Sequence, residues 1–372
     1  GQRVPLHLHW FLPTAGDSHD VVGFGPATGD RPPTLEYLTE VAVNAERLGF
    51  DGVLTPVGSQ CTDPWIATAA LIGATRRLRF IVAVRTGSAS PTLVAQQAAG
   101  FQQLSGGRVV LNVVTGGDPE EQRRYGDWLD HDARYARTDE FLTVIRGSWG
   151  AVPFDFDGDH VHVAGATAGL DAAPVPPIFF GGASPAALRV AARHADVHLS
   201  WGESADQLAP GLARMREVAA EHDRRLQFGV RLHVITRERA RDAWAETDRL
   251  LDAMPPALIA RAQREFAKSQ SVAQQRMMAL HNGRTDDLVV GPNLWAGFGL
   301  VRGGAGTALV GSHDEVAERL VEYHRAGFDH VILSGQPHVE EASWFGEGVM
   351  PLLAREGLLA DTTPEPALAG TR

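Results

Sequence analysis

Short apolar runs of strand length alternate with longer amphipathic segments along most of this chain. The runs are rich in β-branched and aromatic residues and are bounded by glycine, proline or aspartate, as is typical of strands. Helical spacing follows between them, for example over 34–49, which ends at Gly49, and over 91–107, which ends in a double glycine. Eight such alternations favour a TIM (β/α)8 barrel, an α/β fold, over a doubly wound sheet. The predicted strands are LHLHWFL, DGVLTP, RFIVAV, VVLNVV, PIFF, DVHLSW, FGVRLHVIT and HVILS.

The length of 372 residues exceeds that of a bare barrel, which takes about 250 residues. We therefore expect one barrel domain over 1–355 with two insertions, and a loose C-terminal tail over 356–372. The first insertion, about 153–164, is a predicted hairpin that turns at an Asp-Gly pair. The second, about 254–311, ends in glycine-rich sequence after a strand, which fits a mobile lid over the barrel mouth. An insertion that serves packing or an oligomer contact is the alternative.

Charge and cysteine content exclude some classes of protein. The net charge of −11 argues against a nucleic-acid partner, because binding to a phosphate backbone needs a basic surface. Cys61 is the only cysteine, so no internal disulfide can form and a reducing compartment is allowed. No apolar stretch approaches the roughly 20 residues of a membrane span, and the N-terminus lacks the apolar region of a signal peptide. We therefore expect a soluble, cytoplasmic protein without a membrane partner.

Two histidines, His7 and His9, stand two residues apart in the first predicted strand, so both point to the same face. The pair could hold a metal ion, line a pocket or belong to the core. Metal-dependent hydrolases of this architecture need further ligands from later strands, usually histidines and a final aspartate. PIFF supplies none of these ligands, HVILSGQ has no aspartate at its C-terminal end, and His198 alone in DVHLSW does not complete a site, so we expect no metal site.

Arg231 and His233 alternate with apolar residues in FGVRLHVIT, so both point the same way from a strand suited to burial. Burying the charged guanidinium of an arginine without an anionic partner costs roughly several kcal/mol of folding free energy. Either a carboxylate or a ligand must therefore pair with Arg231. Cys61, after the second strand, could be a nucleophile paired with His233, although an inert thiol is the commoner case.

A strand ends in Gly181 and Gly182 within FFGGASPAALRVAARHA, and the Ala183-Ser184 pair then opens a helix. Bare backbone N–H groups and a serine hydroxyl at a helix N-terminus form a phosphate-binding arrangement. Ser184 could also merely cap the helix. No GxGxxG follows the first strand, which counts against a dinucleotide-binding domain.

Several motifs, in order from about residue 6 to 355, resemble the reduced-flavin-dependent alkanesulfonate monooxygenases of the bacterial luciferase superfamily. They include HWFLPTAGD, CTDPW, NVVTGGDPEE, LDHDARY, LSWGE, SGQPHVEEA and the long block PNLWAGFGLVRGGAGTALVG. The resemblance implies a TIM barrel that takes FMNH2 from a separate NAD(P)H-dependent FMN reductase and uses O2 to cleave a carbon–sulfur bond. The products would be an aldehyde and sulfite, and the protein would form homodimers or homotetramers. The small-molecule substrate would be an organosulfonate, whose three oxygens suit arginine forks.

The match to the family pattern also implies roles for individual residues. Arg231 and His233 would stabilise the oxygenated flavin and the sulfonate, and Arg302 would close over the anion as a third catalytic residue. The implied cofactor contacts are Asn112 and Thr115 on the flavin, Tyr135 near its phosphate, and Gly182, Ala183 and Ser184 around that phosphate. The implied pocket residues are Cys61, Trp201 and His338.

Three positions depart from the family pattern. His9 stands where these enzymes commonly carry phenylalanine, Ala15 where they carry histidine, and Gln336 where SGYPH has a tyrosine thought to donate a proton or stabilise oxygen. Gln336 cannot act as an acid near pH 7. We expect His9 and Gln336 to line a pocket for a polar substrate such as sulfoquinovose, since unpaired buried polar groups cost about 1–3 kcal/mol each.

Other interpretations stay open at this point. His9 and Gln336 could bond water, backbone or flavin and leave a preference for simple alkanesulfonates. A metal-dependent TIM-barrel hydrolase and a flavin-binding protein without turnover are the more distant alternatives.

Overall fold

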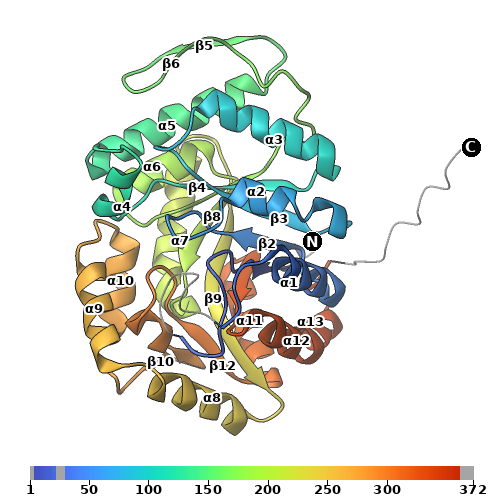
Figure 1. The fold of residues 1–372 in the computed structure, drawn as a ribbon, viewed down its shortest axis with the longest axis vertical. Coiled ribbons are helices and arrows are strands. Elements are labelled where there is room, and N and C mark those ends of the chain that lie inside the picture. Colours follow the sequence, from blue (N-terminus) through green and yellow to red (C-terminus); the bar gives the residue numbers. More distant parts are fainter. Residues whose placement is uncertain (1–3, 22–29, 361–372) are drawn as a thin grey trace, which may run out of the picture.

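A closed barrel of parallel strands surrounded by helices forms the body of the protein, in a computed structural model that describes residues 4–21 and 30–360 (Figure 1). The barrel strands are hydrogen-bonded in the order β1, β2, β3, β4, β7, β8, β9 and β13, and β13 pairs with β1 to close the ring. Each predicted run supplies one barrel strand, so the predicted TIM barrel is confirmed. The barrel strands are β1 His7–Phe11, β2 Gly52–Thr55, β3 Arg79–Arg85, β4 Val109–Val114, β7 Ile178–Gly181, β8 Val197–Trp201, β9 Gln227–Arg237 and β13 His330–Ser334.

The helices begin and end where the local sequence supplies caps. Thr34 accepts a hydrogen bond from the Tyr37 amide at the start of α1, and Gly49, with φ 99°, ends it. The predicted helices 34–49 and 91–107 are therefore confirmed as α1 and α3. The helices are α1 Leu35–Leu48, α2 Pro64–Ala69, α3 Pro91–Ser105, α4 Pro119–Arg124, α5 His131–Ser148, α6 Pro185–His194, α7 Ala205–Ala220, α8 Ala240–Asp252, α9 Pro256–Ala267, α10 Val272–His281, α11 His313–Ala326, α12 His338–Gly348 and α13 Met350–Arg355.

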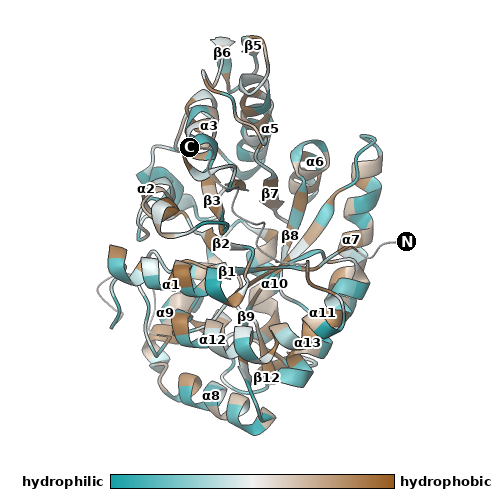
Figure 2. Ribbon diagram, turned by 90° about the vertical axis from the view of Figure 1, so that its right-hand side faces the viewer, coloured by the Kyte–Doolittle hydropathy of each residue, from teal (hydrophilic) through white to brown (hydrophobic). Residues whose placement is uncertain are grey.

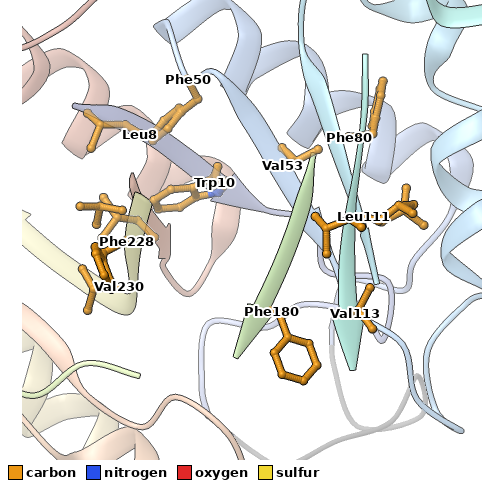
Figure 3. Packing of buried hydrophobic residues seen from close by; sticks show 14 of the residues in the cluster. Leu8, Trp10, Phe50, Val53, Phe80, Leu111, Val113, Phe180, Phe228 and Val230 are labelled. Atoms are coloured by element: carbon orange, nitrogen blue, oxygen red, sulfur yellow. The ribbon is translucent and has the colours of Figure 1, made fainter. Parts of the chain in front are cut away.

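The strands bury side chains on both faces. Outward-pointing residues such as Trp10, Phe80 and Phe180 pack beneath the helices (Figure 3). Hydrophobic colour accordingly concentrates on the central strands, and the helices carry most of the hydrophilic colour (Figure 2). A separate cluster fills the barrel interior, as expected for a packed TIM barrel. It consists of Leu54, Ile81, Val110, Phe179, Val197 and Ile332, with Phe11 and Leu199 packed against it.

The predicted hairpin insertion is present and projects beyond α5 (Figure 1). Its strands, β5 Phe154–Asp157 and β6 His162–Ala166, pair antiparallel. The Gly158 amide donates to the Val161 carbonyl across the turn at 2.9 Å.

The predicted lid insertion, 254–311, packs against the barrel through its own strands. It contains α9, α10, β10 Val289–Gly291, β11 Leu294–Trp295 and the start of β12 Ala308–Ser312. Strand β9 is long enough to pair with three strands: residues 227–231 with β8, residues 229–233 with β13, and residues 233–237 with β12. The sheet therefore forks at His233, and the insertion begins to cover the barrel there. Its movement as a lid stays a prediction.

The glycine-rich end of the insertion is a tight backbone contact. The Gly299 amide donates to the Gly306 carbonyl at 3.0 Å, and a Cβ on Gly306 would lie 2.6 Å from the Gly299 Cα. These glycines allow close packing, which is the function that the alternative interpretation assigned to the insertion.

The predicted tail begins in ordered contact with the barrel. The Leu6 amide donates to the Leu358 carbonyl at 2.7 Å, and Leu358 is buried. Residues 356–360 therefore belong to the N-terminal end of the barrel, which corrects the predicted start of the loose tail. The remainder of the predicted tail, 361–372, lies outside the described residues. In the described part of the chain, no helix is long and apolar enough to cross a membrane.

Candidate active site

The predicted site residues, except His9, lie at the C-terminal end of the barrel. Parallel strands place their carboxyl ends at one edge, so side chains far apart in sequence meet there. Asn112 lies near the end of β4, Trp201 ends β8, and Arg231 and His233 lie in β9 where β8 and β13 end against it. The remaining predicted residues follow strand ends in the loops and in the insertion. They are Cys61, Thr115, Gly182, Ala183, Ser184, Arg302 and Gln336, while Tyr135 lies in α5 and His338 begins α12.

Arg231 is a buried cation held by neutral partners. Its Nη1 donates to the Leu232 carbonyl at 2.6 Å, its Nη2 donates to the Ser334 hydroxyl at 2.9 Å, and its guanidinium lies 4.9 Å from the centre of the Phe11 ring. Among the described residues, no carboxylate forms an ion pair with it. Burial, together with the nearby Arg302 charge, lowers the pKa of Arg231 to about 9. Because no carboxylate of the described residues neutralises it, the Arg231 guanidinium is able to bind an anion.

The tautomer of His233 follows from its two contacts. Its Nε2 lies 2.9 Å from the Ala305 carbonyl, which can only accept, so Nε2 carries the proton. Its Nδ1 then accepts from the Ser334 hydroxyl at 2.8 Å. Ser334 thus links Arg231 to His233, and His233 links both to the glycine-rich end of the insertion. Burial and the Arg231 charge hold the pKa of His233 well below its usual value, so the ring is neutral.

Arg302 and Gln336 meet across the mouth. Arg302 Nη1 donates to Gln336 Oε1 at 3.3 Å, and Gln336 Nε2 donates to the Asp20 carbonyl at 2.5 Å. The amide of Gln336 is therefore hydrogen-bonded on both sides by the protein itself. This matches the alternative in which that side chain bonds backbone, and it weakens the expectation of a polar pocket.

His338 is oriented by a buried carboxylate. Asp17 Oδ1 lies 3.0 Å from His338 Nδ1, and Asp17 Oδ2 accepts from the His338 amide at 2.8 Å and from the Tyr37 hydroxyl. Burial alone would raise the pKa of Asp17, but His338 and Tyr37 together hold it well below its usual value. The Asp17 carboxylate is therefore a fixed negative charge next to His338 Nδ1.

The predicted phosphate-binding turn follows β7 and has a backbone that requires glycine at position 182. Gly182 has φ 122°, and a Cβ there would lie 2.7 Å from the Ala187 Cβ and 3.2 Å from the Tyr135 hydroxyl oxygen, so only glycine fits. Ser184 caps α6 by accepting from the Ala187 amide at 3.2 Å. The His198 Nε2 donates to the Gly182 carbonyl at 2.9 Å and fixes the turn from behind.

Two further predicted flavin contacts lie on or after β4. Asn112 is partly exposed, and its Cα is in register with those of Ala83 and Phe179. The Thr115 hydroxyl lies 3.0 Å from the Thr138 hydroxyl, which itself donates to the Arg134 carbonyl at 2.9 Å. Thr115 therefore donates its proton inside the protein and offers a ligand only an acceptor.

Cys61 and Trp201 flank the mouth without forming a catalytic pair. Burial raises the pKa of the Cys61 thiol, which keeps it protonated, and in the described residues no contact joins it to His233. Trp201 reaches toward the insertion, where a Cβ on Gly304 would lie 3.8 Å from its ring. An inert thiol is the better interpretation of Cys61.

His9 is not at the mouth. Its Nε2 lies 3.0 Å from the His330 Nδ1, and its ring stacks on His330 at 5.3 Å and meets the edge of Phe179 at 6.2 Å. His330 also stacks on His7 at 4.8 Å. The structure therefore places His9 in the barrel core, below the level of Phe11, which corrects its prediction as a substrate-pocket residue. Among the described residues, no group of three His, Cys, Asp or Glu side chains is arranged to hold a metal ion.

Sequence reasoning missed Ser334, Asp17 and His198. Ser334 could have been found, because it ends a predicted strand two residues after Ile332 and so points to the same face. Asp17 and His198 act through loops and neighbouring strands, and no local pattern marks their partners.

Comparison with known proteins agrees with this geometry. Residues 6–330 match the family model described as luciferase-like monooxygenase. Riboflavin lyase RcaE, solved with modified FMN and riboflavin, has a TM-score of 0.79 and 20% identity over 96% of this chain and 93% of its own. Long-chain alkane monooxygenase LadA has a TM-score of 0.79 and 19% identity, covering 98% and 94%. DmoA from Hyphomicrobium sulfonivorans has a TM-score of 0.76 and 22% identity, covering 97% and 90%.

At these identities, the likeness to solved structures shows a shared fold. The match to the family model is stronger evidence of relationship, because it spans most of the chain, from β1 to the start of β13. It therefore includes the strands that hold Arg231 and the Gly182 turn. The chain belongs to the luciferase-like monooxygenase family.

Proposed function

We propose that this chain is a two-component monooxygenase that uses FMNH2 and O2 to cleave the C–S bond of an organosulfonate, producing an aldehyde and sulfite. An NAD(P)H-dependent FMN reductase would supply the reduced flavin, and the protein would act as a homodimer or homotetramer. One observation carries the proposal: Arg231 is a buried guanidinium that no carboxylate of the described residues neutralises, at the mouth of a monooxygenase barrel.

The residues at the Gly182 turn fit FMN. The position that a Cβ would fill, the Tyr135 hydroxyl beside it and the capped N-terminus of α6 suit a phosphate monoester. When bound, reduced FMN would supply two electrons that activate dioxygen, one oxygen atom of which enters the aldehyde while the other leaves as water. Asn112 would contact the flavin by hydrogen bonding, and Thr115 would accept from one of its donors.

The chain's own residues would bind and orient the sulfonate. Arg231 would place charge-assisted hydrogen bonds on its oxygens, and Arg302 would approach from the insertion. His233 is neutral, so it would not carry a positive charge itself. Its Nε2 proton is donated to the Ala305 carbonyl, so the ring would position the insertion and Arg231. Closure of the insertion would exclude water.

Sulfoquinovose remains the substrate that we would try first, with simple alkanesulfonates as the alternative. The case for a polar substrate now depends on Gln336, because His9 lies in the barrel core. Competition between sulfoquinovose and octanesulfonate at equal concentration, with kcat/KM measured for sulfite release, distinguishes the two. A preference for octanesulfonate would refute the polar-substrate proposal and leave the monooxygenase assignment intact.

Arg231→Ala and Arg302→Ala test the proposed function. Loss of a charge-assisted contact to a buried anion should cost roughly 2–5 kcal/mol in kcat/KM for sulfite release. Arg214→Ala is the matched control, since this exposed arginine forms an ion pair with Glu217 on the surface of α7. Sulfite formation driven by NADPH alone, without flavin or reductase, would contradict the proposal. So would an Arg231→Ala variant that loses stability while its folded fraction keeps wild-type activity.

A further inference from the structure

Arg85 ends strand β3 on the face that points into the barrel. Side chains two apart on a strand share a face, and Ile81, four residues earlier, belongs to the cluster inside the barrel. In the closed ring, β3 is four strands from β9 in either direction, so Arg85 and Arg231 lie on opposite sides of the mouth. The Arg85 side chain is only 6% exposed.

The contacts of Arg85 satisfy only part of its guanidinium. Its Nη2 lies 3.4 Å from Glu121 Oε1, and its guanidinium lies 5.2 Å from the centre of the Tyr125 ring. The same Glu121 oxygen accepts from the Ser59 amide at 2.8 Å, so that carboxylate is shared. The Nε and Nη1 of Arg85 are buried and have no hydrogen-bond partner among the described residues.

Leaving these two donors buried without acceptors costs folding free energy unless another molecule supplies the missing acceptors. A buried donor without an acceptor loses its hydrogen bonds to water and gains none in return, and this loss is larger when the group is charged. Arg108, by contrast, is also buried, but its guanidinium donates to four backbone carbonyls and to the Thr75 hydroxyl. The difference indicates that Arg108 serves packing and that the Nε and Nη1 of Arg85 serve a ligand.

The surroundings place these donors at the mouth. Cys61, which follows β2, lies beside the carboxylate that pairs with Arg85, because a Cβ on Gly58 would lie 3.4 Å from Glu121 Oε1 and 3.6 Å from Cys61 Sγ. The mouth is thus lined by Arg85, Arg231 and Arg302 in a protein whose net charge is −11. This local positive potential favours oxygen-rich or anionic molecules.

We propose that Arg85 is a second binding residue of the mouth, which donates to an acceptor oxygen of the bound molecule on the side opposite Arg231. The ligand chemistry is a carbonyl, hydroxyl or anionic oxygen. Under the proposed function, on which this identification rests, that oxygen belongs either to the flavin or to the organosulfonate. Glu121 holds the guanidinium in place and moderates its charge.

The experiment compares Arg85→Gln with Glu121→Gln in the full chain. Binding of oxidised FMN is measured by quenching of flavin fluorescence, and binding of octanesulfonate and of sulfoquinovose by titration calorimetry. Arg85→Gln should weaken one of these ligands at least tenfold, and the ligand that weakens identifies the source of the oxygen. Glu121→Gln should bind that ligand as tightly as the wild type or more tightly, because it leaves the arginine charge unopposed. Arg85→Lys keeps the charge and provides the test if Arg85→Gln does not fold.

Two results would overturn the proposal. One is that Arg85→Gln binds all three ligands with the same Kd values as the wild-type protein. The other is an equal loss of affinity in Arg85→Gln and Glu121→Gln, because a purely structural ion pair predicts that its two halves behave alike. Wild-type protein that binds these ligands but releases no sulfite would refute the proposed function, while the ratio of Kd values still decides the function of Arg85. Wild-type protein that binds none of them would refute both.

Discussion

Acidification should destabilise the barrel through the histidine pair in its core. His330 Nε2 donates to the Gln227 Oε1 at 3.0 Å, so His330 Nδ1 accepts the proton on His9 Nε2. The remaining nitrogen, His9 Nδ1, has no partner among the described residues, and a Cβ on Gly52 would lie 3.0 Å from it. Neither ring can therefore take a second proton without burying an uncompensated charge.

The expected magnitude follows from the pKa of His330. Burial, with nearby His7 and Arg79, lowers this pKa from 6.5 to about 3. The unfolded chain therefore binds more protons than the folded protein between these values, and stability is lost as the pH falls below 6.5. At pH 5 the loss through His330 is about 2 kcal/mol relative to pH 7. His9 adds a loss of the same sign, because burial and His330 hold its pKa well below its usual value.

Equilibrium unfolding in urea at pH 7, 6 and 5 measures this effect. Circular dichroism and tryptophan fluorescence should be followed together, since coincident transitions support two-state behaviour. The window stops at pH 5, above the range in which most carboxylates titrate. His330→Gln removes one titrating group and should lose about 2 kcal/mol less between pH 7 and 5 than the wild type. His162→Gln, on the exposed hairpin, is the control and should keep the wild-type dependence.

A wild-type protein equally stable at pH 7 and pH 5 would refute the reasoning. A His330→Gln variant with the full wild-type loss would show that the acid sensitivity arises elsewhere.

Three further outcomes follow from the site. Gly182→Ala should weaken FMN binding at least tenfold in a fluorescence titration, because the new methyl group meets Ala187 in a backbone conformation with φ 122°; unchanged affinity would remove the turn from the FMN site. Ser334→Ala should lower kcat for sulfite release at least tenfold, whereas Ser334→Thr should recover part of it, because the hydroxyl holds Arg231. Cys61 should react with iodoacetamide at pH 8 more slowly than a free thiol, since burial raises its pKa; faster reaction would contradict the inert interpretation.

The barrel could be predicted from the sequence because each strand has a recognisable local sequence pattern. Runs such as RFIVAV and VVLNVV are apolar throughout, as strands buried on both faces require, and the caps at Thr34 and Gly49 are local signals. The same alternation correctly indicated that Arg231 and His233 share a face. It also indicated that His7 and His9 share one.

Alternation identifies the face of a strand but not the depth along it. His9 lies only two residues before Phe11, yet its ring turns toward His330 and away from the mouth. The partners of Gln336 could not be predicted either, because the Asp20 carbonyl is more than three hundred residues distant in sequence. Such contacts depend on how the strands and loops are registered in three dimensions.

The fork at His233 has a consequence for any attempt to reduce this protein to a minimal barrel. Residues 233–237 of β9 obtain their hydrogen bonds from β12, which follows the insertion directly. Deleting 254–311 together with β12 would leave these residues as an uncovered edge strand, with a row of free amides and carbonyls ready to pair with another chain. A shortened protein would therefore be expected to aggregate through this edge, and its design would have to end β9 near His233 or supply a new covering strand.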